Sequence, residues 1–366
     1  MAEKSKKIKV LVVGCGNMGA SHALSYHKIS GFEICGLVST GESKHVLNRA
    51  LGGKYQTFSD YHEALALTKP DAVCISTYPD THEQFAIQAF KQNCHVFLEK
   101  PVAGTIEGAI RVVEMAKKVN RKLIVGYILR HHPSWQQFIQ LSKNLGKPLV
   151  MRMNLNQQSH GNMWSVHRNI MKTLSPIVDC GVHYIDVMCQ MTASSPLQVS
   201  AIGARLTKDV PENNYNYGQL QIWFEDGSVG WYEAGWGPMV SETAFFVKDV
   251  IGPKGSVSIV AKTASSSGKS DSIAGHTKTE SLRVHWADLD QDNNFSKEDT
   301  WIDFQDEPDH QDLCDREQQY FLKSIMEDID LSAQMEDAVN SLRIALAADE
   351  AVRTGKIIPL TNRSGT

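Results

Sequence analysis

Three short segments contain residues whose types and spacing could support chemistry: Gly14–Gly19, Glu99–Pro101 and Ser175–Asp186. The first, Gly-Cys-Gly-Asn-Met-Gly, directly follows the apolar run 8–13 and precedes a helix-like stretch. In this pattern the first glycine allows a tight turn, the second lets the backbone approach a pyrophosphate, and the third lets the helix pack closely on the strand. We therefore predict a dinucleotide site whose phosphate-binding turn consists of Gly14, Gly16, Asn17, Met18 and Gly19.

The end of the second expected strand bears on which dinucleotide binds. An acidic residue normally holds the ribose 2′-hydroxyl there, whereas this strand ends Val38-Ser39-Thr40, with Lys44 shortly beyond. Hydroxyls and a cation suit a 2′-phosphate better. A plain strand end with a solvated lysine would contain the same residues. We predict NAD or NADP as the cofactor, with Ser39, Thr40 and Lys44 favouring NADP.

Lys100 follows the apolar run 95–98 and Glu99, at the carboxyl end of an expected strand. Ligands of doubly wound sheets bind beyond these ends, so Glu99 and Lys100 are expected to face the cofactor crevice. A partly desolvated lysine can exchange a proton near neutrality, and Pro101 restricts the backbone of the lysine before it. A lysine at a strand end is nevertheless more often a surface cation than a catalyst.

The segment 175–186 predicts a buried helix that carries two functional side chains. Ser175 fits the N-cap and Pro176 the first helical position. Asp179 and His183 then lie four residues apart on one face, while apolar residues cover most of the remaining surface. Polar residues on a buried helix need partners or a function. The alternative is an Asp–His hydrogen bond that satisfies itself in the core.

Two kinds of structure are expected to position these segments. Apolar, β-branched runs at 8–13, 33–38, 72–76, 95–98 and 123–126 alternate with helix-like stretches such as 81–91 and 106–119. This alternation predicts an α/β Rossmann domain, with a doubly wound parallel sheet, over residues 1–126.

From residue 127 to 366 the pattern is that of an α+β domain. Alternating strand patterns occur at 149–155, 198–206, 220–224, 229–234, 244–250 and 256–260, with Asp226-Gly227 as a hairpin turn. Helices are expected at 313–329 and 335–354, with Gly355 as a C-cap, and the Ser/Gly/Lys-rich stretch 263–279 is typical of a mobile loop. These patterns predict a mostly antiparallel sheet with few helices.

Composition argues against several other classes of protein. The net charge is −4 and no long basic run occurs, so neither a nucleic acid nor a membrane is an expected partner. No apolar stretch could span a bilayer and residues 1–7 are polar, which predicts a cytoplasmic protein. The seven scattered cysteines include no CxxC pair and are expected to be reduced. Asp288-x-Asp290-x-Asp292 lacks the sixth-position glycine of a calcium loop, and no metal site is predicted.

The order of the motifs resembles one known family. The glycine fingerprint, Glu99-Lys100-Pro101, the run 126–133 (GYILRHHP) and Asp179-x-Gly181-x-His183-x-x-Asp186 together look like the glucose–fructose oxidoreductase/inositol dehydrogenase (Gfo/Idh/MocA) family. The ending 347–356 is similar to that family's last helix, so the likeness covers nearly the whole chain. The resemblance implies a Rossmann domain followed by a large open-faced, mostly antiparallel sheet, which binds substrate and mediates assembly into a homodimer or homotetramer.

The resemblance also implies roles for individual residues. Lys100, Asp179 and His183 match the family's catalytic trio. Glu99 matches the polar residue before the lysine and His82 the histidine after the fourth strand; with Thr77 and Lys100 they complete the expected cofactor contacts. Five residues in or beside expected pocket loops are candidates for substrate binding, although aromatic residues more often lie in cores and arginines in solvent: Tyr127, Arg130, Trp164, His167 and Arg168.

These assignments predict hydride transfer between a nicotinamide ring and a hydroxyl-bearing carbon of a small sugar or polyol. His183 would accept the hydroxyl proton, Lys100 would stabilise the developing alkoxide, and Asp179 would hold a neighbouring hydroxyl or orient His183. Three alternatives stay open. They are a redox-assisted glycosidase that recycles bound NAD, a catalytically idle dinucleotide sensor, and a Rossmann dehydrogenase of another family.

Overall fold

A computed structural model describes residues 7–241, 246–260, 275 and 277–360 of the chain. The chain forms two compact units. The first consists of Met1–Ile128 and Pro308–Val339, and the second of Leu129–Glu307 and Asn340–Thr366.

The first unit is built on a six-stranded sheet in the order β3-β2-β1-β4-β5-β6, and every pairing in it is parallel. The strands are β1 (Ile8–Val13), β2 (Phe32–Val38), β3 (Thr57–Phe58), β4 (Ala72–Ile75), β5 (His95–Leu98) and β6 (Leu123–Val125). The connecting helices are α1 (Asn17–Lys28), α2 (Ser43–Ala50), α3 (Tyr61–Thr68), α4 (Pro79–Lys91) and α5 (Ile106–Lys118). The predicted doubly wound parallel sheet is confirmed.

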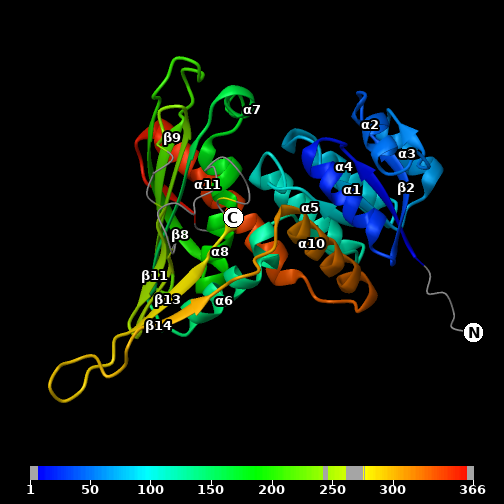
Figure 1. The fold of residues 1–366 in the computed structure, drawn as a ribbon. Helices are drawn as coiled ribbons and strands as arrows, with labels where there is room; N and C mark the ends of the chain where they lie inside the picture. Colours follow the sequence, from blue (N-terminus) through cyan, green and yellow to red (C-terminus); the bar gives the residue numbers. More distant parts are fainter. Residues whose placement is uncertain (1–6, 242–245, 261–274, 276, 361–366) are drawn as a thin grey trace, which may run out of the picture. The chain divides into compact units, whose positions relative to one another are not determined.

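Helix α10 (His310–Met326) packs beside α1 in this unit (Figure 1). It begins with a capping box in which Asp309 and Asp312 bond each other's backbone N–H. Its Phe321 is fully buried and stacks on Phe32 of β2, with ring centroids 6.2 Å apart. The segment Pro308–Val339 therefore groups with the Rossmann unit, whereas the sequence boundaries place it in the domain 127–366. The physical reason is that one face of the parallel sheet needs this helix to cover it.

The second unit contains a nine-stranded sheet in the order β14-β13-β12-β11-β7-β10-β9-β8-β15. Its strands are β7 (Val150–Gln158), β8 (Pro196–Ala204), β9 (Tyr217–Phe224), β10 (Val229–Gly237), β11 (Lys248–Gly252), β12 (Gly255–Val260), β13 (Ser281–Trp286), β14 (Thr300–Asp303) and β15 (Ile358–Pro359). Only β7 and β10 pair in parallel among these named strands. The predicted mostly antiparallel sheet is confirmed.

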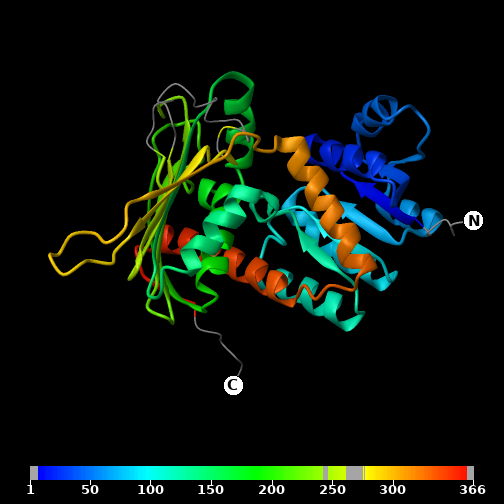
Figure 2. The same ribbon diagram turned by 60° about the horizontal axis from the view of Figure 1, so that its bottom comes forward.

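The helical segments of this unit are η1 (Ile128–His131), α6 (Pro133–Lys143), α7 (Gly161–Ile170), η2 (Ile177–Gly181), α8 (Val182–Thr192) and the later part of α11 (Ser332–Thr354). Helices α6, α8 and α11 lie on one face of the sheet, and no described helix lies on its other face (Figures 1 and 2). The sheet is therefore open-faced, as the resemblance implied. None of the helices in the described ranges has the length and hydropathy to span a bilayer.

Several local predictions can be compared with the structure. Gly227 has a φ of +81° in the turn between β9 and β10, which confirms the Asp226-Gly227 hairpin. Strands β13 and β14 were not predicted. The loop expected at 263–279 lies mostly outside the described residues, which omit 261–274 and 276. A strand was expected at 244–250; among the described residues, β11 runs from Lys248 to Gly252.

Candidate cofactor and substrate site

The glycine turn after β1 has the geometry that a dinucleotide requires. Gly14 has a φ of +91°, and a Cβ there would lie 2.3 Å from the carbonyl oxygen of Ser76. A Cβ on Gly19 would lie 1.9 Å from the carbonyl oxygen of Gly14, so this glycine permits the close approach of α1 to the turn. Gly16 differs, because its missing Cβ faces open space at the N-terminus of α1. The residues present therefore fit a pyrophosphate.

The loop after β2 uses its predicted cation internally. Lys44 is buried, and its Nζ donates to the carbonyl oxygens of Ser39, at 3.0 Å, and Gly41, at 2.8 Å. The hydroxyl of Ser39 lies 2.8 Å from that of Ser43, and Thr40 is exposed. Lys44 thus closes the loop, and the hydroxyls are the groups nearest to solvent. This arrangement was not foreseeable from the residue types alone.

Glu99 and Lys100 lie where the sequence placed them, directly after β5. Glu99 is 6% exposed, and its Oε2 accepts a hydrogen bond from the backbone N–H of Lys100 at 3.2 Å. A Cβ on Gly126, after the neighbouring β6, would come within 3.2 Å of the Glu99 carboxylate, so the glycine provides room for that group. Lys100 itself is half-buried, and the Lys100–Pro101 peptide bond is cis.

His82 forms part of the scaffold beneath this edge. It is buried in α4, with Nδ1 2.7 Å from the carbonyl oxygen of Pro101 and Nε2 3.1 Å from that of Thr77. Burial lowers the pKa of its ring, against the opposing effect of the two carbonyl oxygens, and through these oxygens the ring links the end of β4 to the turn after β5. His82 and Thr77 thus shape the predicted cofactor edge through backbone contacts.

The predicted helix around Asp179 begins as a π-helical turn, η2, and continues as α8. The Ser175 hydroxyl accepts from the backbone N–H of Val178 at 3.1 Å, which confirms its capping role, and donates to Asp349 at 2.7 Å. A Cβ on Gly181 would lie 2.8 Å from the Tyr232 ring, so this glycine lets the turn pack against β10. The π-turn was missed, since nothing in the residue pattern distinguishes it from an α-turn.

Exposure along this segment distinguishes the predicted pair, Asp179 and His183, together with Cys180. Between Ile177 and Cys189 every residue is buried except Asp179, Cys180 and His183, which are half-buried. The thiol of Cys180 is 3.5 Å from Asp179 Oδ2 and 3.7 Å from Gln157 Oε1. An otherwise buried helix therefore presents a carboxylate, a thiol and an imidazole on its accessible side, which is a suitable set for hydrogen bonding hydroxyls and moving a proton.

Arg130, a substrate candidate, is held in a buried ion pair. Its Nε and Nη2 donate to Asp186 of α8 at 2.8 and 2.5 Å, and the two side chains are 10% and 1% exposed. Gln190 adds a third hydrogen bond to the same carboxylate, at 2.9 Å. These contacts indicate that Arg130 fixes α8 against η1, a role that a planar bidentate guanidinium fits well.

The other substrate candidates are largely internal. Tyr127 is fully buried. His167 stacks on Trp236 with ring centroids 4.2 Å apart, and Trp164 belongs to the same apolar cluster. Arg168 is half-buried, with its guanidinium 5.8 Å from the Trp164 ring and Nη1 3.6 Å from Asp209. Of these four, Arg168 is the one with substantial access to solvent.

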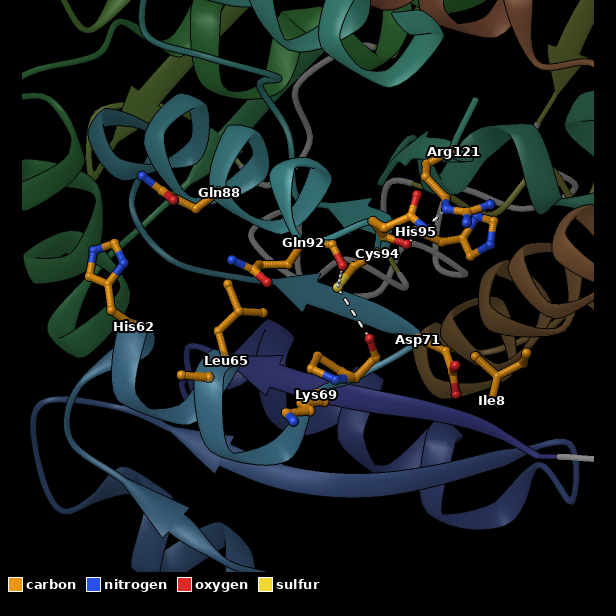
Figure 3. Close-up of a pocket in the computed structure, with 13 residues that line it drawn as sticks. Ile8, His62, Leu65, Lys69, Asp71, Gln88, Gln92, Cys94, His95 and Arg121 are labelled. Atoms are coloured by element: carbon orange, nitrogen blue, oxygen red, sulfur yellow. Dashed lines mark hydrogen bonds between the residues drawn. The ribbon is translucent and has the colours of Figure 1, made fainter. Parts of the chain in front are cut away.

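A cavity of about 730 Å³ in the first unit lies at the amino ends of the strands, opposite to the carboxyl ends where a dinucleotide binds (Figure 3). It is lined by residues at the amino ends of the strands, including Ile8, Asp71, His95 and Arg121, and by the ends of α3 and α4. Its lining includes none of the predicted site residues. Burial raises the pKa of the Cys94 thiol in it to about 12, so this group is not a nucleophile at neutral pH. We assign the cavity no function.

Two buried residues near Glu99 were not predicted. His22 on α1 lies 2.7 Å from Glu99 Oε1, and Gln318 on α10 lies 3.1 Å from the other ring nitrogen of His22. The only signal in the sequence is a histidine on the apolar face of the helix that follows the glycine turn. Its partners are 77 and 296 residues away, beyond any local pattern.

Comparison with known proteins agrees with this architecture. A family model described as "Oxidoreductase family, NAD-binding Rossmann fold" matches residues 8–127, and the "GFO/IDH/MocA C-terminal domain" model matches residues 137–258. Together these matches span more than half of the chain.

Curated relatives include an inositol 2-dehydrogenase of Burkholderia ambifaria, 26% identical over 50% of this chain and 53% of that protein. Another is inositol 2-dehydrogenase 2 of Saccharopolyspora erythraea, 29% identical over 48% of this chain and 51% of that protein. The chain spans about half the length of the curated relatives it matches.

Solved structures share the fold over the whole chain. Scyllo-inositol dehydrogenase from Lactobacillus casei with bound NAD(H) and scyllo-inositol has a TM-score of 0.75 at 22% identity, covering 97% of this chain and 99% of that one. An oxidoreductase from Agrobacterium radiobacter, in complex with NAD+, L-tartaric acid and magnesium, has a TM-score of 0.77 at 14% identity, covering 97% and 98%. With both domain models matched in order, the chain belongs to the Gfo/Idh/MocA family of oxidoreductases, whose first domain is an NAD-binding Rossmann fold.

Proposed function

We propose that this protein is an NAD(P)-dependent dehydrogenase that transfers a hydride between nicotinamide and a hydroxyl- or keto-bearing carbon of a sugar or polyol. The observation that carries the proposal is the Gly14–Gly19 turn, in which two glycines are required by backbone contacts and the third faces open space at a helix N-terminus. Family membership and the inositol dehydrogenases among the relatives support a cyclic polyol as the first substrate to test.

Lys100, Asp179 and His183 are the proposed catalytic residues. The bound nicotinamide supplies the hydride acceptor or donor. In the oxidation direction, His183 accepts the proton of the reacting hydroxyl, and the Lys100 ammonium stabilises the negative charge that develops on its oxygen. Asp179 accepts a hydrogen bond from a neighbouring substrate hydroxyl or orients His183. This mechanism requires the Lys100 ammonium and the His183 imidazole to contact the same hydroxyl group.

The test is an absorbance assay at the NAD(P)H band with a panel of inositols, other polyols, aldoses and keto-sugars, each with NAD and with NADP. We expect turnover with at least one polyol or sugar. His183→Ala should lower kcat by about 100-fold or more while NADH binding changes by less than twofold, because proton transfer contributes about 10²–10⁴-fold. No turnover with any member of the panel, or an unaffected His183→Ala variant, would contradict the proposed function.

The predicted preference for NADP depends on Ser39 and Thr40, because Lys44 is engaged by the carbonyls of its own loop. A glutamate at the end of β2 would accept hydrogen bonds from a ribose 2′-hydroxyl and repel a 2′-phosphate. Ser39→Glu should therefore shift the ratio of kcat/KM for NAD and NADP toward NAD. An unchanged ratio would remove Ser39 from the cofactor site.

We also propose that the open face of the nine-stranded sheet mediates a homodimer or homotetramer. Exposed apolar side chains on three of its strands, Ile202, Ile251 and Trp301, support this assignment. Light scattering of the wild type and of Trp301→Lys tests it; a monomeric wild type would contradict it.

A further inference from the structure

A chain of buried hydrogen bonds leads from α10 through α1 to Glu99, entirely within the first unit. The Tyr26 hydroxyl donates to Gln318 Oε1 at 2.5 Å. Gln318 Nε2 lies 3.1 Å from His22 Nδ1, and His22 Nε2 lies 2.7 Å from Glu99 Oε1. The other oxygen of Glu99 accepts from the backbone N–H of Lys100. His22 and Gln318 are both fully buried, so each link has a large effect on the groups beside it.

The hydrogen bonds assign one tautomer to His22. The Tyr26 hydroxyl donates to Gln318 Oε1, so the amide nitrogen of Gln318 is turned toward His22. The amide nitrogen of Gln318 can then only donate to His22 Nδ1, which must be unprotonated. The ring proton is therefore on Nε2, where it is donated to Glu99. In this tautomer His22 donates to the Glu99 carboxylate, which stabilises the ionised form of Glu99.

A second carboxyl nearby, Glu317, does not share this charge. It is fully buried, and burial, followed by the charge of Glu99, raises its pKa well above the ordinary value. Two carboxylates cannot both ionise cheaply in one apolar region. The hydrogen bonds stabilise a negative charge on Glu99, and burial beside that charge favours the protonated form of Glu317.

The same region contains a possible metal-ligand set, since ligand atoms of His22, Cys314 and Glu317 lie within 4.8 Å of one another. Both ring nitrogens of His22 are already engaged, by Gln318 and Glu99. A metal would also need a thiolate and a carboxylate, whereas burial raises the pKa of both Cys314 and Glu317. The donor set therefore suits the hydrogen-bond chain better than it suits a cation.

The position of Glu99 in the sheet gives the charge a function. The strand order reverses between β1 and β4, and dinucleotides bind across that point, with one mononucleotide over each half of the sheet. Glu99 ends β5, in the half opposite to the glycine turn, where the nicotinamide belongs. The nicotinamide ring is cationic when oxidised and neutral when reduced, so a fixed negative charge there favours the oxidised form.

We propose that His22 and Gln318 are positioning residues that keep Glu99 ionised and oriented, so that the first unit binds the oxidised dinucleotide preferentially. This inference rests on the proposed function, because it requires a nicotinamide cofactor. The Glu99 carboxylate, in addition to the neighbouring Lys100, then determines the ratio of the affinities for the oxidised and the reduced dinucleotide. Helix α10 then has an electrostatic role in addition to covering the sheet.

The test measures the dissociation constants of NAD+ and NADH, or of the NADP pair if that pair binds, for the full-length protein without substrate. NADH is followed by its fluorescence and NAD+ by competition. Glu99→Gln removes the charge near the ring, and His22→Leu removes the donor that keeps Glu99 ionised. Each variant should therefore weaken NAD+ binding by about tenfold and NADH binding by less than about twofold. Gln318→Leu, which frees the tautomer without removing the Nε2 donor, should change the ratio by about threefold.

Three further variants distinguish positioning from general damage. His22→Gln retains a donor toward Glu99 and should keep the wild-type ratio. Gln311→Leu is the matched control, because Gln311 also bridges α10 to α1, through Ser21 and Ser25, without touching Glu99. The double variant His22→Leu/Glu99→Gln should have the ratio of Glu99→Gln alone. If His22→Leu does not fold, the near-isosteric Glu99→Gln and the Gln318→Leu variant give the same comparison.

The outcomes are separable from those of the proposed function. Equal weakening of both cofactor forms in Glu99→Gln and His22→Leu, with wild-type binding intact, would overturn this inference alone. Failure of the wild type to bind either dinucleotide would overturn it together with the proposed function. One equivalent of zinc that copurifies with the wild type and is lost in Cys314→Ser would also overturn it, because the metal would occupy a nitrogen of His22.

Discussion

The two units hold their buried charges in different ways. In the Rossmann unit, the Glu99 carboxylate lies 2.7 Å from the His22 ring and accepts a hydrogen bond from a backbone N–H. In the sheet unit, the Asp186 carboxylate is paired with the Arg130 guanidinium, and Lys248 is buried beside the rings of Tyr184 and Phe246. Uncharged donors leave the net charge of a carboxylate available to interact with a ligand. In an ion pair the opposite charge neutralises it, and the pair holds two elements together.

The units also differ in why they need glycine. A Cβ on Gly19 would collide with backbone, the Gly14 carbonyl oxygen at 1.9 Å. A Cβ on Gly181 would collide with a side chain, the Tyr232 ring at 2.8 Å. Backbone cannot move without opening the turn, whereas a ring can shift at moderate cost. The cofactor turn is therefore specified by main-chain geometry, and the Asp179 segment by packing.

The largest effect is expected at Arg130, whose ion pair with Asp186 represents the second unit in this comparison of buried charges. Arg130→Met removes the guanidinium that is paired bidentately with the buried Asp186 carboxylate, 1% exposed, and should destabilise the second unit by about 3–5 kcal/mol. All seven tryptophans lie between residues 135 and 301, so denaturant unfolding followed by tryptophan fluorescence reports on this unit. Arg130→Met/Asp186→Asn should recover most of the loss. A loss below about 1 kcal/mol would place the pair among those that contribute little.

The contrast between the glycines predicts the next largest effect. Gly19→Ala should abolish measurable NADH binding and destabilise the first unit by about 3 kcal/mol, because α1 must move away from the turn. Gly181→Ala should cost about 1–2 kcal/mol, since the Tyr232 ring can adjust. Gly16→Ala is the control: its Cβ meets nothing within 4 Å, so stability should be retained while NADH affinity falls. Equal stability of Gly19→Ala and wild type would refute the backbone requirement.

A smaller effect, a gain in the stability of the second unit and not a loss, is expected on substitution of Lys248. Burial lowers its pKa from 10.5 to about 8, so folding carries a penalty that is absent above pH 10.5 and grows as pH falls to 8. Lys248→Met keeps the stem and removes the charge, and should stabilise the second unit by about 1–2 kcal/mol at pH 7. The gain should vanish near pH 10.5. Thermal unfolding across this range tests it, and a gain that is independent of pH would show that packing, not charge, is responsible.

Local sequence patterns were sufficient for much of the fold. The strands that begin at Ile8, Ala72, His95 and Leu123 were predicted to within one residue at each end, because buried parallel strands are continuous apolar runs. The glycine turn and the Ser175 cap were predicted for the same reason: each is decided by residues within a few positions. Strand β13 was missed although Leu282, Val284 and Trp286 alternate with polar residues, a signal that was available.

The candidate site was less accessible to sequence reasoning. Arg130 was expected at the substrate and lies in an ion pair with Asp186, and Trp164 and His167 lie in an apolar cluster with Trp236. Lys44 was expected near a 2′-phosphate and bonds its own loop. In each case the residue type was noted and its partner was not, since partners come from segments far away in the chain.

By itself the sequence determined the family, the parallel sheet, the glycine turn and the identities of the polar groups at the ends of β5 and η2. Only the tertiary structure decided that His22, Gln318 and Glu99 form one hydrogen-bonded chain, and that Asp179, Cys180 and His183 share the accessible side of a buried helix. The physical reason is range. Dihedral preferences and hydrophobic periodicity act over a few residues, whereas protonation and hydrogen-bond direction depend on groups that meet only after the chain has folded.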